Sequence, residues 1–132
     1  MAASTDRLRR LIADEVGECC DADVERRLDD LDSLAERATT DRLDADCRAM
    51  AALGSETRHR IARLLATADD ALCVCELRPL VDVSESAVSH ALSDLVDAGL
   101  VSRESRGKWR YYESTPPAQR VFAALDATGD GV

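Results

Sequence analysis

Apolar side chains recur every three or four positions along the N-terminal third of the chain. The stretches 8–16 and 24–35 each place such residues on one face of a helix, and Gly17 separates them. The second stretch is long, and its apolar stripe suits packing against another helix of the same chain or of a partner. The pattern therefore predicts two amphipathic helices ahead of the rest of the protein.

Shorter helices are predicted next, each bounded by a local signal. A helical segment over 42–53 ends at Gly54, and Ser55 is placed to cap the helix that follows. Asp70 is expected to cap a short helix that begins at Ala71 and ends near Pro79.

The helix with the clearest signals lies in "VSESAVSHALSDLVDAGL", residues 83–100. Ser84 is its expected N-cap, Val83 and Val88 hold the two positions of a hydrophobic staple, and Gly99 is a stop signal. The buried stripe is expected to be Val88, Leu92, Leu95 and Val96. The outward face carries short polar side chains: Glu85, Ser86, Ser89, His90, Ser93 and Asp94.

After Gly99 the pattern changes to that of β-strands. The segments "LVSRE" and "KWRYYE" flank a turn predicted at Ser105–Gly107, which indicates a β-hairpin. A last helix is expected from about Pro117 to Leu125. Short helices followed by a hairpin predict a winged helix-turn-helix, a mainly α fold with a small β wing.

Composition excludes several classes of protein. The chain has 132 residues, with 45% hydrophobic and 33% charged, which is typical of one folded domain and not of a disordered chain. No apolar run is long enough for a membrane span, and the N-terminus lacks the apolar segment of a signal peptide. The odd number of cysteines, five, fits reduced thiols better than a secreted disulfide framework, so we predict a cytoplasmic protein.

The net charge of −9 argues by itself against binding to nucleic acid. Lys108 is the only lysine, and such an Asp-rich, Lys-poor composition favours a salt-loaded cytoplasm and a halophilic archaeal source. The charge is also uneven, because residues 101–112 carry four basic groups and one acidic group.

This local basic segment adjoins the helix with short polar residues, and together they fit DNA recognition. Compact donors and acceptors can reach base edges in the major groove, and cations on a wing can contact the phosphate backbone. A helix N-terminus can bind a phosphate as well. The alternative is an ordinary solvated helix beside a charged hairpin. The predicted DNA-binding residues are Ser84, Ser86, Ser89, His90, Arg103, Arg106, Lys108 and Arg110.

The segment from about Ala52 to Tyr112, with "ALGSETRHRIARLL", "SAVSHALSDLVDAGLV" and "GKWRYY", resembles the ArsR/SmtB family of metal-responsive repressors. The resemblance implies a homodimeric winged-helix repressor of double-stranded operator DNA that releases it when an inducer binds, with the terminal helices as the dimer interface. We accordingly divide the chain into an N-terminal helical extension at 1–40, a DNA-binding domain at 41–115 and a C-terminal dimerisation helix and tail at 116–132. Glu85, where Gln is frequent, and Ala91, where a second His is common, depart from the family pattern at the operator-reading helix.

The motif "LCVCEL" places Cys73 and Cys75 one residue apart, and it matches the "ELCVCDL" of many family members. With Asp70 as the N-cap, Cys73 falls at the third helical position, where the helix dipole lowers the thiol pKa and favours a metal-binding thiolate. In a regular helix such a pair points roughly 200° apart, so joint chelation is expected to require a distorted turn.

Two thiolates leave the coordination of As(III) or of a tetrahedral ion incomplete. Some family members have a third cysteine where Arg78 stands here, so the missing sulfur must come from elsewhere. Cys19 and Cys20 are adjacent between two predicted helices, and the resemblance extends to relatives whose N-terminal cysteines complete the site. Cys47 is a weaker candidate and is expected to be a buried small residue.

An all-sulfur ligand set selects soft ions. His90 belongs to the predicted DNA face, and His59 is expected to be exposed and structural. The C-terminal helix has no histidine, so the carboxylate–histidine zinc site of some family members is absent. We therefore expect As(III) or Sb(III) as the inducer, with Cd(II), Pb(II) or Zn(II) as the alternative.

The sequence bears on two other functions. The cysteines could instead form a thiol redox switch, through Cys19–Cys20 or Cys73–Cys75. An enzyme is not expected, because CxxC, a phosphate-binding glycine loop and an acid–base pair with a nucleophile are all missing, and no tightly bound cofactor is expected.

Overall fold

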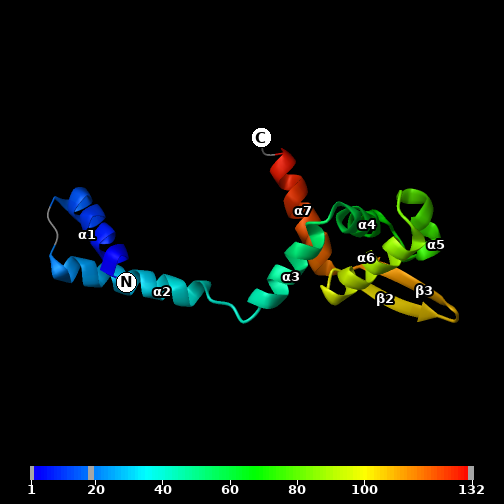
Figure 1. The fold of residues 1–132 in the computed structure, drawn as a ribbon, viewed down its shortest axis with the longest axis horizontal. Coiled ribbons are helices and arrows are strands. Elements are labelled where there is room, and N and C mark those ends of the chain that lie inside the picture. The colour runs from blue at the N-terminus through cyan, green and yellow to red at the C-terminus, as the bar shows by residue number, and fades with distance from the viewer. Residues whose placement is uncertain (1, 18–19, 131–132) are drawn as a thin grey trace. The chain divides into compact units, whose positions relative to one another are not determined.

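The computed structural model describes residues 2–17 and 20–130. The chain divides into two compact units, Met1–Asp41 and Arg42–Val132 (Figure 1). Among the described residues, no helix has the length and apolar character that crossing a membrane requires.

The first unit is a pair of helices, α1 (Ala2–Val16) and α2 (Asp21–Ala38), that pack against each other. Gly17 ends α1 with φ of 83°, a left-handed conformation that glycine adopts without strain. Arg9 of α1 forms a salt bridge with Asp21 at the start of α2, with 2.8 Å between Nη1 and Oδ1. The two predicted amphipathic helices are therefore confirmed.

The second unit contains most of the elements. They are α3 (Leu43–Leu53), α4 (Glu56–Thr67), β1 (Leu72–Cys73), α5 (Val74–Leu77), the 3-10 helix η1 (Arg78–Leu80), α6 (Glu85–Asp97), β2 (Val101–Arg106), β3 (Trp109–Ser114) and α7 (Pro116–Asp130). Ser55 and Ser84 cap α4 and α6 as predicted, because each side chain accepts a hydrogen bond from the backbone N–H three residues on. Gly99 follows α6 with φ of 78°.

The turn of the β-hairpin is one residue shorter than predicted, and the sheet has a third strand. Arg106 pairs with Trp109, so the turn consists of Gly107 and Lys108 and not of Ser105–Gly107. The strand β1, which the sequence did not indicate, adds to the sheet in the antiparallel order β1-β3-β2, with Cys73 opposite Tyr111. The wing is therefore tied to the segment that carries the cysteine pair.

The core of this unit lies between α4, α6, the sheet and α7. Val88, Leu92 and Leu95 of α6 are fully enclosed, as the predicted stripe requires, whereas Val96 is only half-buried. Each such enclosed side chain contributes about 1.5–3 kcal/mol relative to exposure. Ala118 and Phe122 of α7 complete the core, so the helix that follows the wing is held against α4.

Candidate functional site

The outward face of α6 carries the predicted base-reading residues in exposed positions. Ser86, Ser89 and His90, together with Ser93, line a shallow depression of about 170 Å³. Ser84 at the head of the helix accepts a hydrogen bond from the N–H of Ala87, with 3.1 Å between Oγ and N. A hydroxyl can donate while it accepts, so this cap leaves a proton for a phosphate oxygen.

Two acidic side chains of α6 are matched by arginines from other elements. Glu85 lies 3.7 Å from Arg78 of η1, and Asp94 lies 3.6 Å from Arg58 of α4. Arg58 is held in place by the carbonyl of Ala52, which accepts from its Nε at 2.8 Å. These pairs offset negative charge on the helix that carries the predicted base-reading residues.

The hairpin β2–β3, the wing, carries the predicted phosphate-binding cations on its surface. Arg103, Lys108 and Arg110 are exposed, and within residues 2–17 and 20–130 they take part in no salt bridge. Arg106 differs, because it lies 3.3 Å from Glu104 and over the ring of Tyr111, at 4.6 Å. An acidic chain thus concentrates positive charge on the hairpin beside α6.

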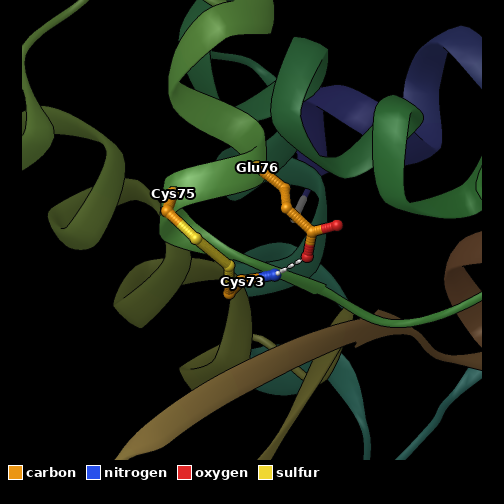
Figure 2. The surroundings of a disulfide bond; sticks show 3 residues. All are labelled: Cys73, Cys75 and Glu76. Atoms are coloured by element: carbon orange, nitrogen blue, oxygen red, sulfur yellow. Dashed lines mark hydrogen bonds between the residues drawn. A yellow bond between two sulfur atoms is a disulfide. The ribbon is translucent and has the colours of Figure 1, made fainter.

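The cysteine pair lies where β1 becomes α5, and this changes its predicted geometry. Cys73 is the N-cap of α5, with extended backbone at φ −91° and ψ 168°, and not the third helical position. Its backbone N–H donates to Glu76 Oε1 at 3.0 Å, while its sulfur forms a disulfide with Cys75 (Figure 2). Because Cys73 lies outside the helix and Cys75 within it, the two side chains are not separated as they would be in a regular helix, and the expected distortion of a helical turn is wrong.

A hollow of about 350 Å³ opens beside this pair. Cys73, Val74 and Cys75 form one side, and Glu85, Ser89 and Ser93 of α6 form another. The hairpin closes it with charged and aromatic side chains, namely Arg103, Lys108, Trp109, Arg110 and Tyr112. The predicted inducer residues and several predicted DNA-binding residues therefore line one cavity.

Cys20, at the start of α2, is exposed and belongs to the first unit. Its backbone N–H and its thiol both donate to Asp23 Oδ2, at 3.3 and 3.2 Å. These hydrogen bonds, the thiol's first, lower the pKa of Asp23 below its ordinary value of 3.8. Cys19 lies outside the described residues.

Two predicted environments are wrong. Cys47 is exposed on α3 and not buried, because the core contact of that helix is made by Ala52. His59 is half-buried and not exposed, because its ring packs edge-on against Phe122 of α7 at 5.3 Å. Among the residues that the structure describes, no group of three or more His, Cys, Asp or Glu is placed to hold a metal ion.

Sequence reasoning missed Glu76 and the aromatic side of the hollow. The spacing of Cys73 and Glu76 is that of a capping box, with cysteine in place of serine, so that pattern could have revealed the cap. Trp109 and Tyr112 gave no such signal, because their position beside the cysteines depends on the pairing of β1 with β3.

The exposed polar helix and the cationic hairpin define this chain as a winged helix-turn-helix DNA-binding protein. Residues 55–103 match the family described as "Bacterial regulatory protein, arsR family". A Halobacterium salinarum protein named as an arsenical resistance operon repressor, ArsR, is 47% identical over 96% of this chain and 98% of its own length. The chain therefore belongs to the ArsR family of transcriptional repressors, and it is not an enzyme.

A second relative and a solved structure agree with this family. A second Halobacterium salinarum protein, named ArsR2 and also as an arsenical resistance operon repressor, is 46% identical over 66% of this chain and 73% of its own. The homodimeric winged helix-turn-helix domain of a Mycobacterium bovis regulator superposes with a TM-score of 0.61 at 26% identity, covering 70% of this chain and 89% of that one.

Proposed function

We propose that this protein represses an arsenical-resistance operon and releases its operator when As(III) or Sb(III) binds Cys73 and Cys75. The observation that supports this most is the shared cavity, which Cys73 and Cys75 line together with Ser89 and the wing cations. The names of the Halobacterium salinarum relatives point to the same inducer class. Cd(II), Pb(II) or Zn(II) is the alternative ion.

On the DNA side, α6 reads base edges through Ser86, Ser89 and His90. Arg103, Arg106, Lys108 and Arg110 hold the phosphate backbone, and Ser84 contributes a phosphate contact at the helix N-terminus. The repressor acts as a homodimer, for which exposed apolar side chains on α7, Val121 and Leu125, supply part of an interface.

Release of the operator is explained by the place at which the inducer binds. As(OH)₃ loses one water for each thiol that it binds, so two As–S bonds fix Cys73 and Cys75 to one atom. That atom then lies in the hollow between α5, α6 and the wing, and it alters the spacing between the base-reading helix and the backbone-contacting hairpin. A third sulfur completes the coordination, and we propose Cys19 or Cys20 as its donor on chemical grounds.

The test is operator binding by the reduced protein with and without arsenite. Wild type is expected to release DNA, whereas Cys73→Ser and Cys75→Ser keep it bound. Cys47→Ser removes an exposed cysteine elsewhere in the same unit, so it is the control and behaves as wild type. Release by cadmium but not by arsenite contradicts the metalloid assignment.

The DNA face has its own test. Arg103→Ala is expected to weaken binding to all sequences and reduce the salt dependence by about one unit of slope, because it removes one phosphate contact. Ser89→Ala is expected to change the preferred bases instead, with little change in the salt slope. Uniform weakening by both substitutions contradicts the assignment of helix and wing.

The Cys73–Cys75 disulfide favours one second candidate, a repressor that responds to oxidation. Hydrogen peroxide oxidises the two thiols to the disulfide and is itself reduced to two waters. Peroxide that releases the operator from wild type but not from Cys75→Ser, with arsenite inactive, supports this candidate.

A further inference from the structure

We propose that Arg58 is a positioning residue for operator binding, which couples α3 to the base-reading helix α6 and thereby sets the half-site spacing that the dimer accepts. The homodimer and the reading of bases by α6, on which this rests, belong to the proposed function. Arg58 itself is not among the predicted DNA contacts, so the role assigned to it is a further one.

The guanidinium of Arg58, on α4, bridges the end of α3 and the second half of α6. Its Nε donates to the carbonyl of Ala52 at 2.8 Å, and its Nη2 donates to the carbonyl of Ala51 at 3.3 Å. Its Nη1 lies 3.6 Å from Oδ2 of Asp94. The last carbonyls of a helix are short of partners within that helix, and an arginine side chain can cap them. One side chain therefore joins three helices.

Packing between α3 and α6 is limited where this bridge lies. Of the residues of α3, all of which the structure describes, Ala52 is the only one that is buried. A hollow of about 570 Å³ opens between the helices, and it is lined by Arg48, Ala51, Ala52, Arg58, Asp94 and Asp97. Because a hollow and not interlocking apolar side chains lies here, the contacts of Arg58 determine how α3 is placed relative to α6.

The helices α3 and α7, which both carry exposed apolar side chains, are held by α4. On α3, Leu43 and Met50 are 63% and 77% exposed, and their spacing of seven residues puts them on one face. Arg63 of α4 forms a salt bridge with Asp126 of α7 at 2.9 Å and lies over the ring of Phe122 at 4.7 Å. In the proposed homodimer a second copy covers the exposed apolar side chains, so α4 connects the interface to α6.

The connection between the interface and α6 determines which operators fit. In a two-fold dimer, a displacement of α6 within one protomer is repeated in the other. Half-sites lie about one helical turn apart, and each added base pair moves them by about 3.4 Å and about 35°. A rigid bridge at Arg58 therefore excludes an altered spacing, whereas a loosened one tolerates it.

The experiment measures how strongly the reduced full-length protein discriminates between half-site spacings. Wild type selects a duplex with two half-sites from a random pool, and that duplex is made again with one base pair added or removed between them. Fluorescence anisotropy of the labelled duplexes gives each Kd at several salt concentrations. The variants are Arg58→Gln, Arg58→Lys and Asp94→Asn. Glu85→Gln is the matched control, because Glu85 is an exposed acid that pairs with Arg78 at the other end of α6.

Wild type is expected to bind the selected spacing at least about tenfold more tightly than either altered spacing. Arg58→Gln is expected to reduce this ratio to about threefold or less, because glutamine lacks the charge and the fork of donors. Arg58→Lys keeps the charge without the fork and is expected to lie between the two. Asp94→Asn is expected to reduce the ratio by less than Arg58→Gln, because the two carbonyl contacts remain. The salt dependence stays at its wild-type value throughout, since no phosphate contact is removed.

Three results would overturn the role of Arg58. The first is a spacing ratio that stays at the wild-type value in Asp94→Asn and in Arg58→Lys, and these variants decide the matter if Arg58→Gln does not fold. The second is a salt slope reduced by about one unit in the Arg58 variants, which is the mark of a phosphate contact. The third is an equal fall of the ratio in Glu85→Gln, which would be a general effect of charge on α6.

The positioning role and the proposed function fail separately. If the bridge variants lose spacing discrimination while arsenite leaves the operator bound to wild type, the inducer is wrong and the role of Arg58 stands. If arsenite releases the operator while the bridge variants discriminate as wild type does, the proposed function stands and the role of Arg58 is wrong. If wild type itself has no spacing preference, the homodimer and the role of Arg58 are both wrong.

Discussion

In the part of the chain that the structure describes, two helices have a cysteine as N-cap, and both caps are built in the same way. Cys20 precedes α2 and Cys73 precedes α5, and in both cases an acidic side chain three residues on accepts the cysteine's backbone N–H. Asp23 and Glu76 are those acceptors, at 3.3 and 3.0 Å. The local chemistry is thus one capping box used twice.

The surroundings of the two caps differ. Cys20 is exposed at the head of an 18-residue helix, whereas Cys73 is 6% exposed, ends a strand of the sheet and starts a helix of only four residues. In the sequence, the neighbouring cysteine of Cys73 comes after it, at position 75, whereas that of Cys20 comes before it, at position 19. The same cap thus occurs in two settings, and among the described residues a second sulfur and a cavity lie beside it only at Cys73.

Leucine truncation should show how differently the two helices depend on the fold. Leu77 of α5 is fully buried, so Leu77→Ala is expected to cost about 2–5 kcal/mol of unfolding free energy. Leu34 of α2 is 53% exposed, and Leu34→Ala is expected to stay within about 0.5 kcal/mol. Urea denaturation followed by circular dichroism measures both, and equal losses would remove the distinction.

The substitution Arg78→Cys adds a third sulfur next to the C-terminal end of α5. Position 78 follows Cys75 by three residues, a spacing that shares one face of a helical turn. Arsenite affinity is expected to rise about tenfold and to become independent of Cys19 and Cys20, as measured by calorimetry. Arg60→Cys, at another exposed arginine, is the control; an equal gain there would refute the role of position 78.

Removing the acceptor from the Cys73 cap should have a smaller effect. Glu76→Ala leaves the Cys73 N–H without its partner and is expected to cost about 1 kcal/mol or less. Glu76→Gln keeps an acceptor oxygen and is expected to restore most of the loss. Thermal unfolding measures the difference, and no change in either variant would mean that the hydrogen bond contributes nothing.

The smallest effect concerns the Cys20 cap and its pH dependence. The hydrogen bonds from Cys20 hold the pKa of Asp23 below 3.8, so their stabilisation is present above pH 3.8 and is lost as pH falls through the lowered pKa. Cys20→Ala removes the thiol donor and is expected to raise the Asp23 pKa toward 3.8. Carboxyl NMR titration measures it, with Cys47→Ala as a control that should leave Asp23 unchanged.

The helix and the hairpin that carry the proposed DNA contacts could be predicted well, because their signals are local. Ser84 caps α6 and Val88 is buried, and these two residues lie only four positions apart. The change to a strand pattern after Gly99 marks the hairpin. The cations that the sequence placed on the wing are all exposed there. Capping and side-chain periodicity are properties of the backbone, and they require no distant partner.

Only part of the cysteine site could be predicted, because its geometry depends on residues that are far apart in the sequence. The sequence by itself determined that two thiols lie one residue apart ahead of the polar helix. Only the tertiary structure decided that Cys73 is extended, because β1 forms by pairing with Tyr111 and Tyr112 far along the chain. That pairing brings Trp109 and the wing cations to the sulfurs, and contacts between such distant residues leave no periodic pattern in the sequence.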